Sequence, residues 1–68
     1  MKQNWNDFLG KTREEIVGVL GEPDAKGAIS RKYREPQIYK YGDIEFHFYH
    51  KTCWMVFDEA KHETLCKQ

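Results

Sequence analysis

Histidines and cysteines are the residues of this 68-residue chain whose types and spacing first suggest chemistry. His47, His50 and Cys53 follow one another at intervals of three, and His62 and Cys66 lie further along. Imidazole and thiolate are the ligands that zinc prefers, so the pattern could describe a compact metal site. The same side chains could form a nucleophilic pair in which a histidine activates a thiol. Both hypotheses depend on whether the fold brings these side chains together.

A second group of residues could bind nucleic acid. Cationic side chains and one tyrosine are concentrated in a turn-rich stretch, where they could contact phosphates and stack on a base. Acidic residues at 22, 24 and 35 dilute the local positive charge, which disfavours this function. We therefore keep a nucleic-acid-associated protein as the alternative function. The residues that would carry it lie in the loop from Lys26 to Arg34 and are Lys26, Arg31, Lys32, Tyr33 and Arg34.

The first third of the chain predicts one or two short helices. Asn4 can cap a helical segment whose apolar residues follow at helical spacing and which stops at Gly10. Thr12 and Glu15 match a capping box, which predicts a helix that begins at Arg13. A Gly-x-Pro sequence about two turns later ends this helix.

The segment from residue 38 to residue 57 predicts three antiparallel strands joined by two-residue turns at 42–43 and 50–51. The turn positions determine which residues lie opposite each other and therefore which share a face. Residues 22–36 read as a long connector, with a short irregular strand near 29–33 as an option, and 59–68 as a polar, frayed or weakly helical tail. The expected core face carries Tyr39, Tyr41, Ile44, Phe46, Phe48, Cys53, Met55 and Phe57.

The opposite face of this sheet is mixed in character. Helices from one short segment can cover only one face of a sheet, so the other face meets solvent or a partner. Aromatic and apolar residues, with Trp as a frequent anchor, are typical of protein interfaces. We therefore predict a surface that binds another protein or a second copy of this chain, giving a homodimer. Its residues are Ile38, His47, Tyr49, Trp54 and Val56.

The same alternation separates the histidines from the cysteines. His47 falls on the outer side, Cys53 on the core side and His50 in a turn, so we expect no metal site and no cofactor. Cys53 is expected to be buried and inert, and Cys66 lies in the mobile tail. Without a converging nucleophile, base and orienting group, no enzymatic activity is expected.

The composition describes one small domain over residues 1–68, with a polar tail at about 59–68. Lysine and arginine number 11 and aspartate and glutamate 11, and this neutral balance argues against a protein whose main task is to bind nucleic acid or an anionic membrane. No apolar run approaches the length of a signal peptide or a membrane span. Two cysteines without an export signal predict reduced thiols and a cytoplasmic location.

Residues 10–24, with the sequence GKTREEIVGVLGEPD, resemble the segment G-x-[ST]-x-x-[EQ]-[VI]-x-x-x-[LF]-G-x-P of small SmpA/OmlA (BamE-like) domains. The resemblance implies an α+β fold with one or two short N-terminal helices packed on one face of a three-stranded antiparallel meander. It also implies a habit of binding proteins. The expected function is that of a small non-catalytic accessory, inhibitor or immunity-type domain.

Overall fold

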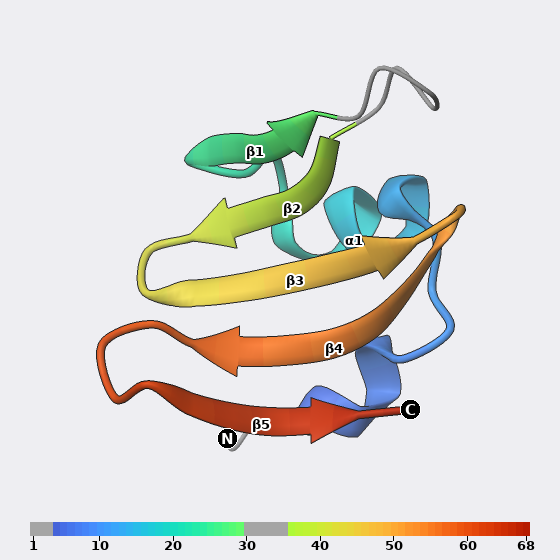
Figure 1. Cartoon of the computed structure of the whole chain (residues 1–68). Helices are drawn as coiled ribbons and strands as arrows, with labels where there is room; N and C mark the ends of the chain where they lie inside the picture. Colours follow the sequence, from blue (N-terminus) through green and yellow to red (C-terminus); the bar gives the residue numbers. More distant parts are fainter. Residues whose placement is uncertain (1–3, 30–35) are drawn as a thin grey trace.

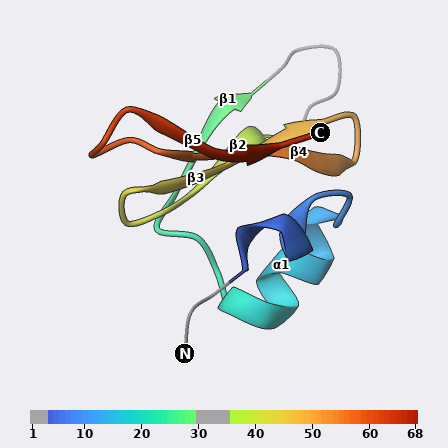
Figure 2. The same cartoon turned by 90° about the horizontal axis from the view of Figure 1, so that it is seen from below.

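A computed structural model describes residues 4–29 and 36–68 as a sheet with helices on one of its sides (Figures 1 and 2). The sheet has five strands, each antiparallel to the next, in the order in which they occur along the chain. The predicted three-stranded meander is therefore wrong. The strands are β1 (Ala25–Ile29), β2 (Pro36–Tyr41), β3 (Ile44–Tyr49), β4 (Thr52–Asp58) and β5 (Glu63–Lys67).

The two additional strands come from segments that the sequence predicts to be irregular. β1 occupies part of the expected connector and pairs with β2, and β5 occupies part of the expected polar tail and pairs with β4. Leu65 and Cys66 of β5 pack against the core, so the tail is anchored by burial. His62 allows the turn before β5 with a φ of 51°, in the left-handed region where histidine is more frequent than most residues.

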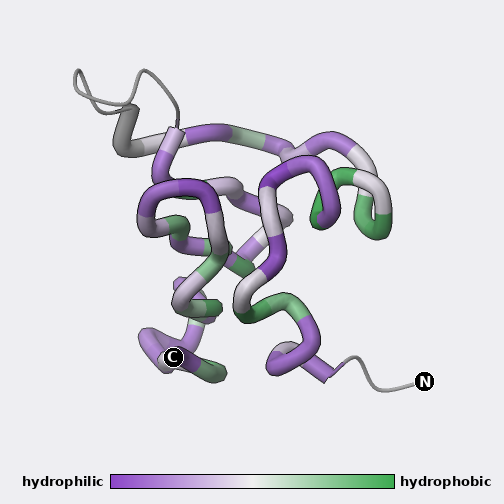
Figure 3. The backbone as a smooth tube through the Cα atoms, turned by 90° about the vertical axis from the view of Figure 1, so that its right-hand side faces the viewer, coloured by the Kyte–Doolittle hydropathy of each residue, from purple (hydrophilic) through white to green (hydrophobic). Residues whose placement is uncertain are grey.

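The helical layer consists of a 3₁₀-helix, η1 (Trp5–Phe8), and one α-helix, α1 (Arg13–Leu20). The predicted capping box is confirmed, because Thr12 Oγ1 accepts from the Glu15 amide at 3.2 Å and Glu15 Oε1 accepts from the Thr12 amide at 3.0 Å. Hydrophobic residues occur in short stretches along the chain (Figure 3), and no helix in the described part is long and apolar enough to cross a membrane.

A β-bulge in β4 determines which residues face the helices. Phe48 pairs with Cys53 as predicted, but His47 pairs with Met55, so Trp54 is an extra residue in β4. Beyond this point the strand's two sides are exchanged relative to the prediction. Met55 and Phe57 lie on the side away from the helices, and Val56 is in the core with 0% of its surface exposed. The buried apolar residues are Phe8, Ile16, Tyr39, Phe46, Phe48, Cys53 and Val56.

Arg13 fixes the beginning of α1 to the sheet. Its buried guanidinium donates from Nε and Nη2 to the Pro36 carbonyl, at 2.9 and 2.7 Å, and from Nη1 to the His50 carbonyl, at 3.2 Å. The guanidinium carbon lies 4.6 Å from the centre of the Phe48 ring. A buried cation needs its donors satisfied, and here two backbone carbonyls and an aromatic face contribute to this. Arg13 therefore connects α1, the start of β2 and the turn between β3 and β4.

The bulge predicts that two neighbouring truncations lower the stability by unequal amounts. Val56→Ala should lower the free energy of unfolding by about 2 kcal/mol, because two buried methyl groups are lost and a cavity forms. Met55→Ala removes more atoms but should cost less than about 1 kcal/mol, because Met55 lies on the uncovered side. Urea denaturation, monitored by circular dichroism, measures the free energy of unfolding of both variants. A larger loss of free energy of unfolding for Met55→Ala than for Val56→Ala would contradict the bulge and support the register that the sequence predicts.

Arg13 should not be replaceable by lysine. Arg13→Lys keeps the charge but removes the planar fork that reaches two carbonyls, so we expect the free energy of unfolding to fall by roughly 2 kcal/mol. Lys11→Arg, at an exposed position nearby, serves as the control and should stay within about 0.5 kcal/mol of wild type. Thermal and urea denaturation would test this pair, and equal stability of the two variants would mean that charge alone suffices at position 13.

Candidate functional site

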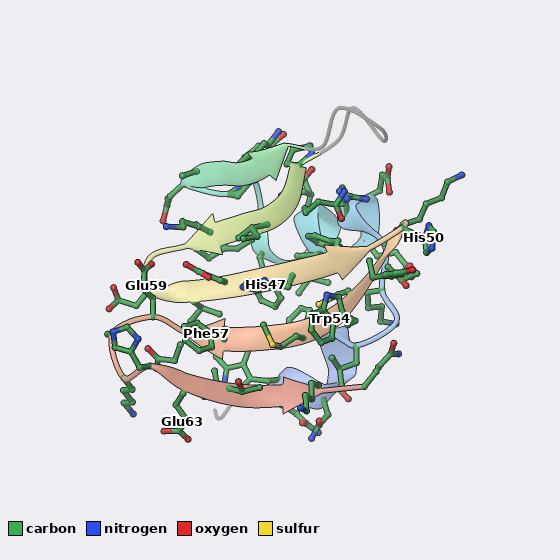
Figure 4. The ribbon with its side chains drawn as sticks, in the orientation of Figure 1. His47, His50, Trp54, Phe57, Glu59 and Glu63 are labelled. Carbon is green, nitrogen blue, oxygen red and sulfur yellow. The ribbon has the colours of Figure 1, made fainter. Side chains whose placement is uncertain are left out.

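The side of the sheet away from the helices is here called the outer face, and no helix formed by residues 4–29 or 36–68 packs on it (Figure 2). Trp54 is 36% exposed and Tyr49 is 56% exposed, although both are large hydrophobic residues. Such residues are frequent anchors of protein interfaces. Figure 4 shows Trp54, Phe57 and His47 together on this face. The outer face comprises Ile38, Lys40, Glu45, His47, Tyr49, Trp54, Met55 and Phe57.

A polar network occupies the middle of the outer face. Glu45 is only 9% exposed, although it lies on the uncovered side of the sheet. Its Oε1 lies 2.9 Å from His47 Nε2, and its Oε2 lies 3.5 Å from Lys40 Nζ. Lys40 Nζ also donates to Glu59 Oε2 at 3.3 Å. The side chains of neighbouring residues therefore shield this carboxylate and satisfy it.

These contacts change the acidity of Glu45 and Lys40 in opposite directions. Burial raises the pKa of Glu45, but hydrogen bonds with His47 and Glu59 and the nearby charges of His47 and Lys40 outweigh burial, so the pKa lies below its ordinary value. The hydrogen bond to Glu59, with the charges of Glu59 and Glu45, raises the pKa of Lys40. The lowered pKa of Glu45 and the raised pKa of Lys40 both indicate that the ionised carboxylate and the ammonium stabilise each other.

Aromatic side chains continue the face on either side of this network. The rings of His47 and Phe57 meet edge to face with centroids 6.3 Å apart, and the Phe57 and His62 rings are 6.4 Å apart. Beside Trp54 the surface forms a hollow of about 480 Å³. The bulge leaves the indole partly exposed, while the Trp54 carbonyl accepts a hydrogen bond from the Gln68 amide at 2.8 Å. The lining residues are Tyr49, His50, Thr52, Trp54 and Gln68.

The structure places four of the five predicted partner-binding residues on the outer face. Ile38 and His47 are opposite each other on β2 and β3, and Tyr49 and Trp54 line the same hollow. The prediction for Val56 is wrong, because the bulge turns this side chain into the core. Met55 and Phe57, predicted as core, take its place. Alternation of apolar residues in β4 could not reveal this exchange, because both sides of the strand are apolar.

The structure describes only one of the residues predicted for the alternative, nucleic-acid-binding function, which is Lys26. Lys26 pairs with Tyr39, on the helix side of the sheet, and its Nζ lies 5.4 Å from the centre of the Tyr39 ring. This places Lys26 on the opposite side from Trp54. The other members, Arg31, Lys32, Tyr33 and Arg34, lie outside the described residues.

The cysteines and histidines lie in separate surroundings. Cys53 is fully buried, as predicted, and burial raises the pKa of its thiol to about 11. Burial also raises the pKa of Cys66. Thiols with raised pKa values are poor nucleophiles at neutral pH. In residues 4–29 and 36–68, no three side chains of His, Cys, Asp or Glu are grouped so that they could hold a metal ion.

Comparisons of this chain with protein-family models, curated proteins and solved structures found no match. The relationship to BamE-like domains therefore stays a prediction from the motif in residues 10–24. The three-stranded layout that the resemblance implies does not apply, because the sheet has five strands. The assignment of the site depends on the geometry of the outer face.

The Glu45 network should make the free energy of unfolding depend on pH. A carboxylate with a lowered pKa stabilises the fold fully above its unfolded value, near 4.5, and this contribution is lost as the pH falls through the folded pKa. We expect the free energy of unfolding to fall below pH 4.5, and Glu45→Gln to reduce that fall and to lower stability at pH 7. Urea denaturation at a series of pH values tests this. Glu14→Gln, at an exposed carboxylate on α1, is the control and should keep the wild-type pH dependence.

Proposed function

We propose that this chain is a non-catalytic protein-binding domain, of the accessory, inhibitor or immunity type, that binds its partner through the outer face. The observation that carries the proposal is the uncovered sheet face on which Trp54, Phe57 and Met55 are gathered. Interfaces concentrate their binding energy in a few rigid, largely desolvated aromatic residues surrounded by polar groups. The outer face has this composition, with apolar side chains beside the Lys40–Glu45–His47 network.

The rigidity of the face supports the same function. Trp54 accepts a backbone hydrogen bond from the Gln68 amide at 2.8 Å, and Cys53 exchanges backbone hydrogen bonds with Gly10 and Lys11, each at 2.8 Å. The strand that carries the anchor is therefore hydrogen-bonded along both edges around the bulge. An anchor that is already positioned loses less conformational entropy when a partner binds.

The free thiols of Cys53 and Cys66 are compatible with a reducing compartment, and we propose the cytoplasm as the site of action. In this proposal the partner is another protein. A second copy of this chain is the other occupant that the tests below must distinguish.

Trp54→Glu should abolish partner binding and leave the domain folded. A charged side chain at a central anchor should weaken binding at least about 30-fold, because anchors of this kind contribute 2 kcal/mol or more. The measurement is affinity capture from a lysate of the protein's own source, followed by titration of the identified partner against the purified domain. A two-dimensional NMR spectrum of each variant checks the fold.

Val19→Glu is the matched control, because Val19 is 69% exposed on α1, on the helix side. This variant introduces the same charge on a different surface and should retain the partner. Loss of binding in both variants, or in neither, would contradict the assignment of the outer face. If Trp54→Glu unfolds the domain, then Trp54 contributes to the core and the assignment of the two sides of β4 is wrong.

A further inference from the structure

The hollow beside Trp54 lies at the end of the outer face where β3 turns into β4. Tyr49 and Thr52 are opposite each other across this turn, and Trp54 follows on the same side of β4. The two large rings of the hollow therefore come from neighbouring strands and stand on one surface. Figure 4 shows His50 at the tip of the turn, at the end of the face that carries Trp54. The described residues that line the hollow include no lysine, arginine, aspartate or glutamate.

Contacts with the rest of the fold hold both walls of the hollow in place. The His50 ring meets the Tyr49 ring edge to face, with centroids 4.2 Å apart. The His50 carbonyl accepts from the buried Arg13 guanidinium at 3.2 Å, so the turn that carries these rings is fixed to α1. On the other wall, the Trp54 carbonyl accepts from the Gln68 amide at 2.8 Å. The backbone of both walls is therefore in place before a ligand arrives, which limits the entropy lost on binding.

The polar side chains of the hollow are rich in hydrogen-bond donors. The Trp54 indole N–H can only donate, and the Tyr49 hydroxyl and the Gln68 side-chain amide can donate as well. Within residues 4–29 and 36–68, no hydrogen bond engages these three side chains. Without a carboxylate in the described lining, none of its side chains is restricted to accepting. The ligand that matches this lining brings carbonyl oxygens and an apolar body, and few N–H groups that burial would leave unpaired.

Proline has this chemistry. Its side chain is an apolar ring, it has no backbone N–H, and it favours the polyproline II helix, whose carbonyls are not paired within the segment. Aromatic-lined grooves are the surfaces that bind such segments. We propose that the hollow binds a proline-rich segment of the partner protein, with a proline ring against Trp54 and Tyr49 and a peptide carbonyl accepting from the indole N–H. This inference rests on the proposed function and adds the chemical class of the partner segment.

Two other occupants match the hollow less well. A methylated lysine also stacks on aromatic rings, but the described lining supplies no carboxylate to balance its charge. A second copy of these 68 residues offers no proline-rich segment, because it contains two prolines, Pro23 and Pro36, that are far apart in the sequence. Pro36 also belongs to β2, and its carbonyl accepts from Arg13. The tests below include both occupants.

The first test uses the whole chain, labelled with ¹⁵N, and three short capped peptides of equal length. One has a central run of prolines, in the second alanine replaces each proline, and in the third a trimethylated lysine replaces one of these alanines. We expect the proline peptide to shift the amide signals of Tyr49, Thr52 and Trp54 and the Trp54 indole signal, and the other two to shift none of them. Because the described lining is uncharged, the affinity should change less than about twofold between about 0.02 M and about 0.5 M salt.

The second test changes the two walls of the hollow separately. Tyr49→Ala should weaken binding of the proline peptide roughly tenfold, because one aromatic wall is lost. Trp54→Phe keeps an aromatic ring but removes the indole N–H, and it should weaken binding roughly three- to tenfold. Val19→Ala, at an exposed position of α1, is the control and should keep the wild-type affinity. An NMR spectrum of each variant checks the fold, and wild-type affinity in either folded wall variant would overturn the proposal.

The remaining outcomes separate this proposal from the proposed function. No binding of the proline peptide, equal binding of the alanine peptide, or tighter binding of the trimethyllysine peptide would overturn the proposal. The Trp54→Glu capture decides the proposed function independently, because a captured partner can bind the outer face without a proline-rich segment. Sedimentation velocity is the last measurement. Self-association that Trp54→Glu disrupts would make a second copy the occupant and would also overturn the proposal.

Discussion

The organisation of this protein depends on one extra residue in β4. Strands alternate their side chains between two faces, so an inserted residue exchanges the faces for the rest of the strand. The insertion at Trp54 sends Val56 into the core and moves Met55 and Phe57 to the outer face. Without it the outer face would lose two large apolar side chains, and the core would have to accommodate them in place of a valine. The bulge therefore shapes the core and the candidate site together.

The hydrophobic core is small, and side chains of the helical layer complete it. Trp5 and Phe8 of η1 approach the Phe46 ring, with centroids 6.1 and 5.1 Å away. Arg13 joins α1 to carbonyls from two separate parts of the sheet. The segment between the helices, at Gly10 and Lys11, extends the pairing of β4 beyond the end of β5. The helical layer therefore holds the strand that carries Trp54 as well as covering the core.

The parts of this fold that depend on a few adjacent residues could be predicted from the sequence. The parts that depend on pairing between distant segments could not. The capping box at Thr12 and the turn at 42–43 each depend on a few adjacent residues, and both the start of α1 and the pairing of β2 with β3 are as predicted. β1 lacks strand-forming character because its residues are Ala25, Lys26, Gly27, Ala28 and Ile29, and it exists through pairing with β2. β5 is held similarly by β4. The bulge left no sign in the alternation, because Trp54, Met55, Val56 and Phe57 are all apolar.

Under the proposed function, the Glu45 network accounts for how a sheet face with exposed aromatic residues would select its partner. A partner that covers the outer face must exclude water from a carboxylate that is already mostly buried. That carboxylate tolerates the loss of water because His47 and Lys40 remain beside it. A nonspecific apolar surface gains contact with Trp54 and Phe57 but offers nothing to Lys40, Glu45 and Glu59 at their exposed edges. Polar groups held in place beside the aromatic anchors thus penalise wrong partners more than they strengthen the right one.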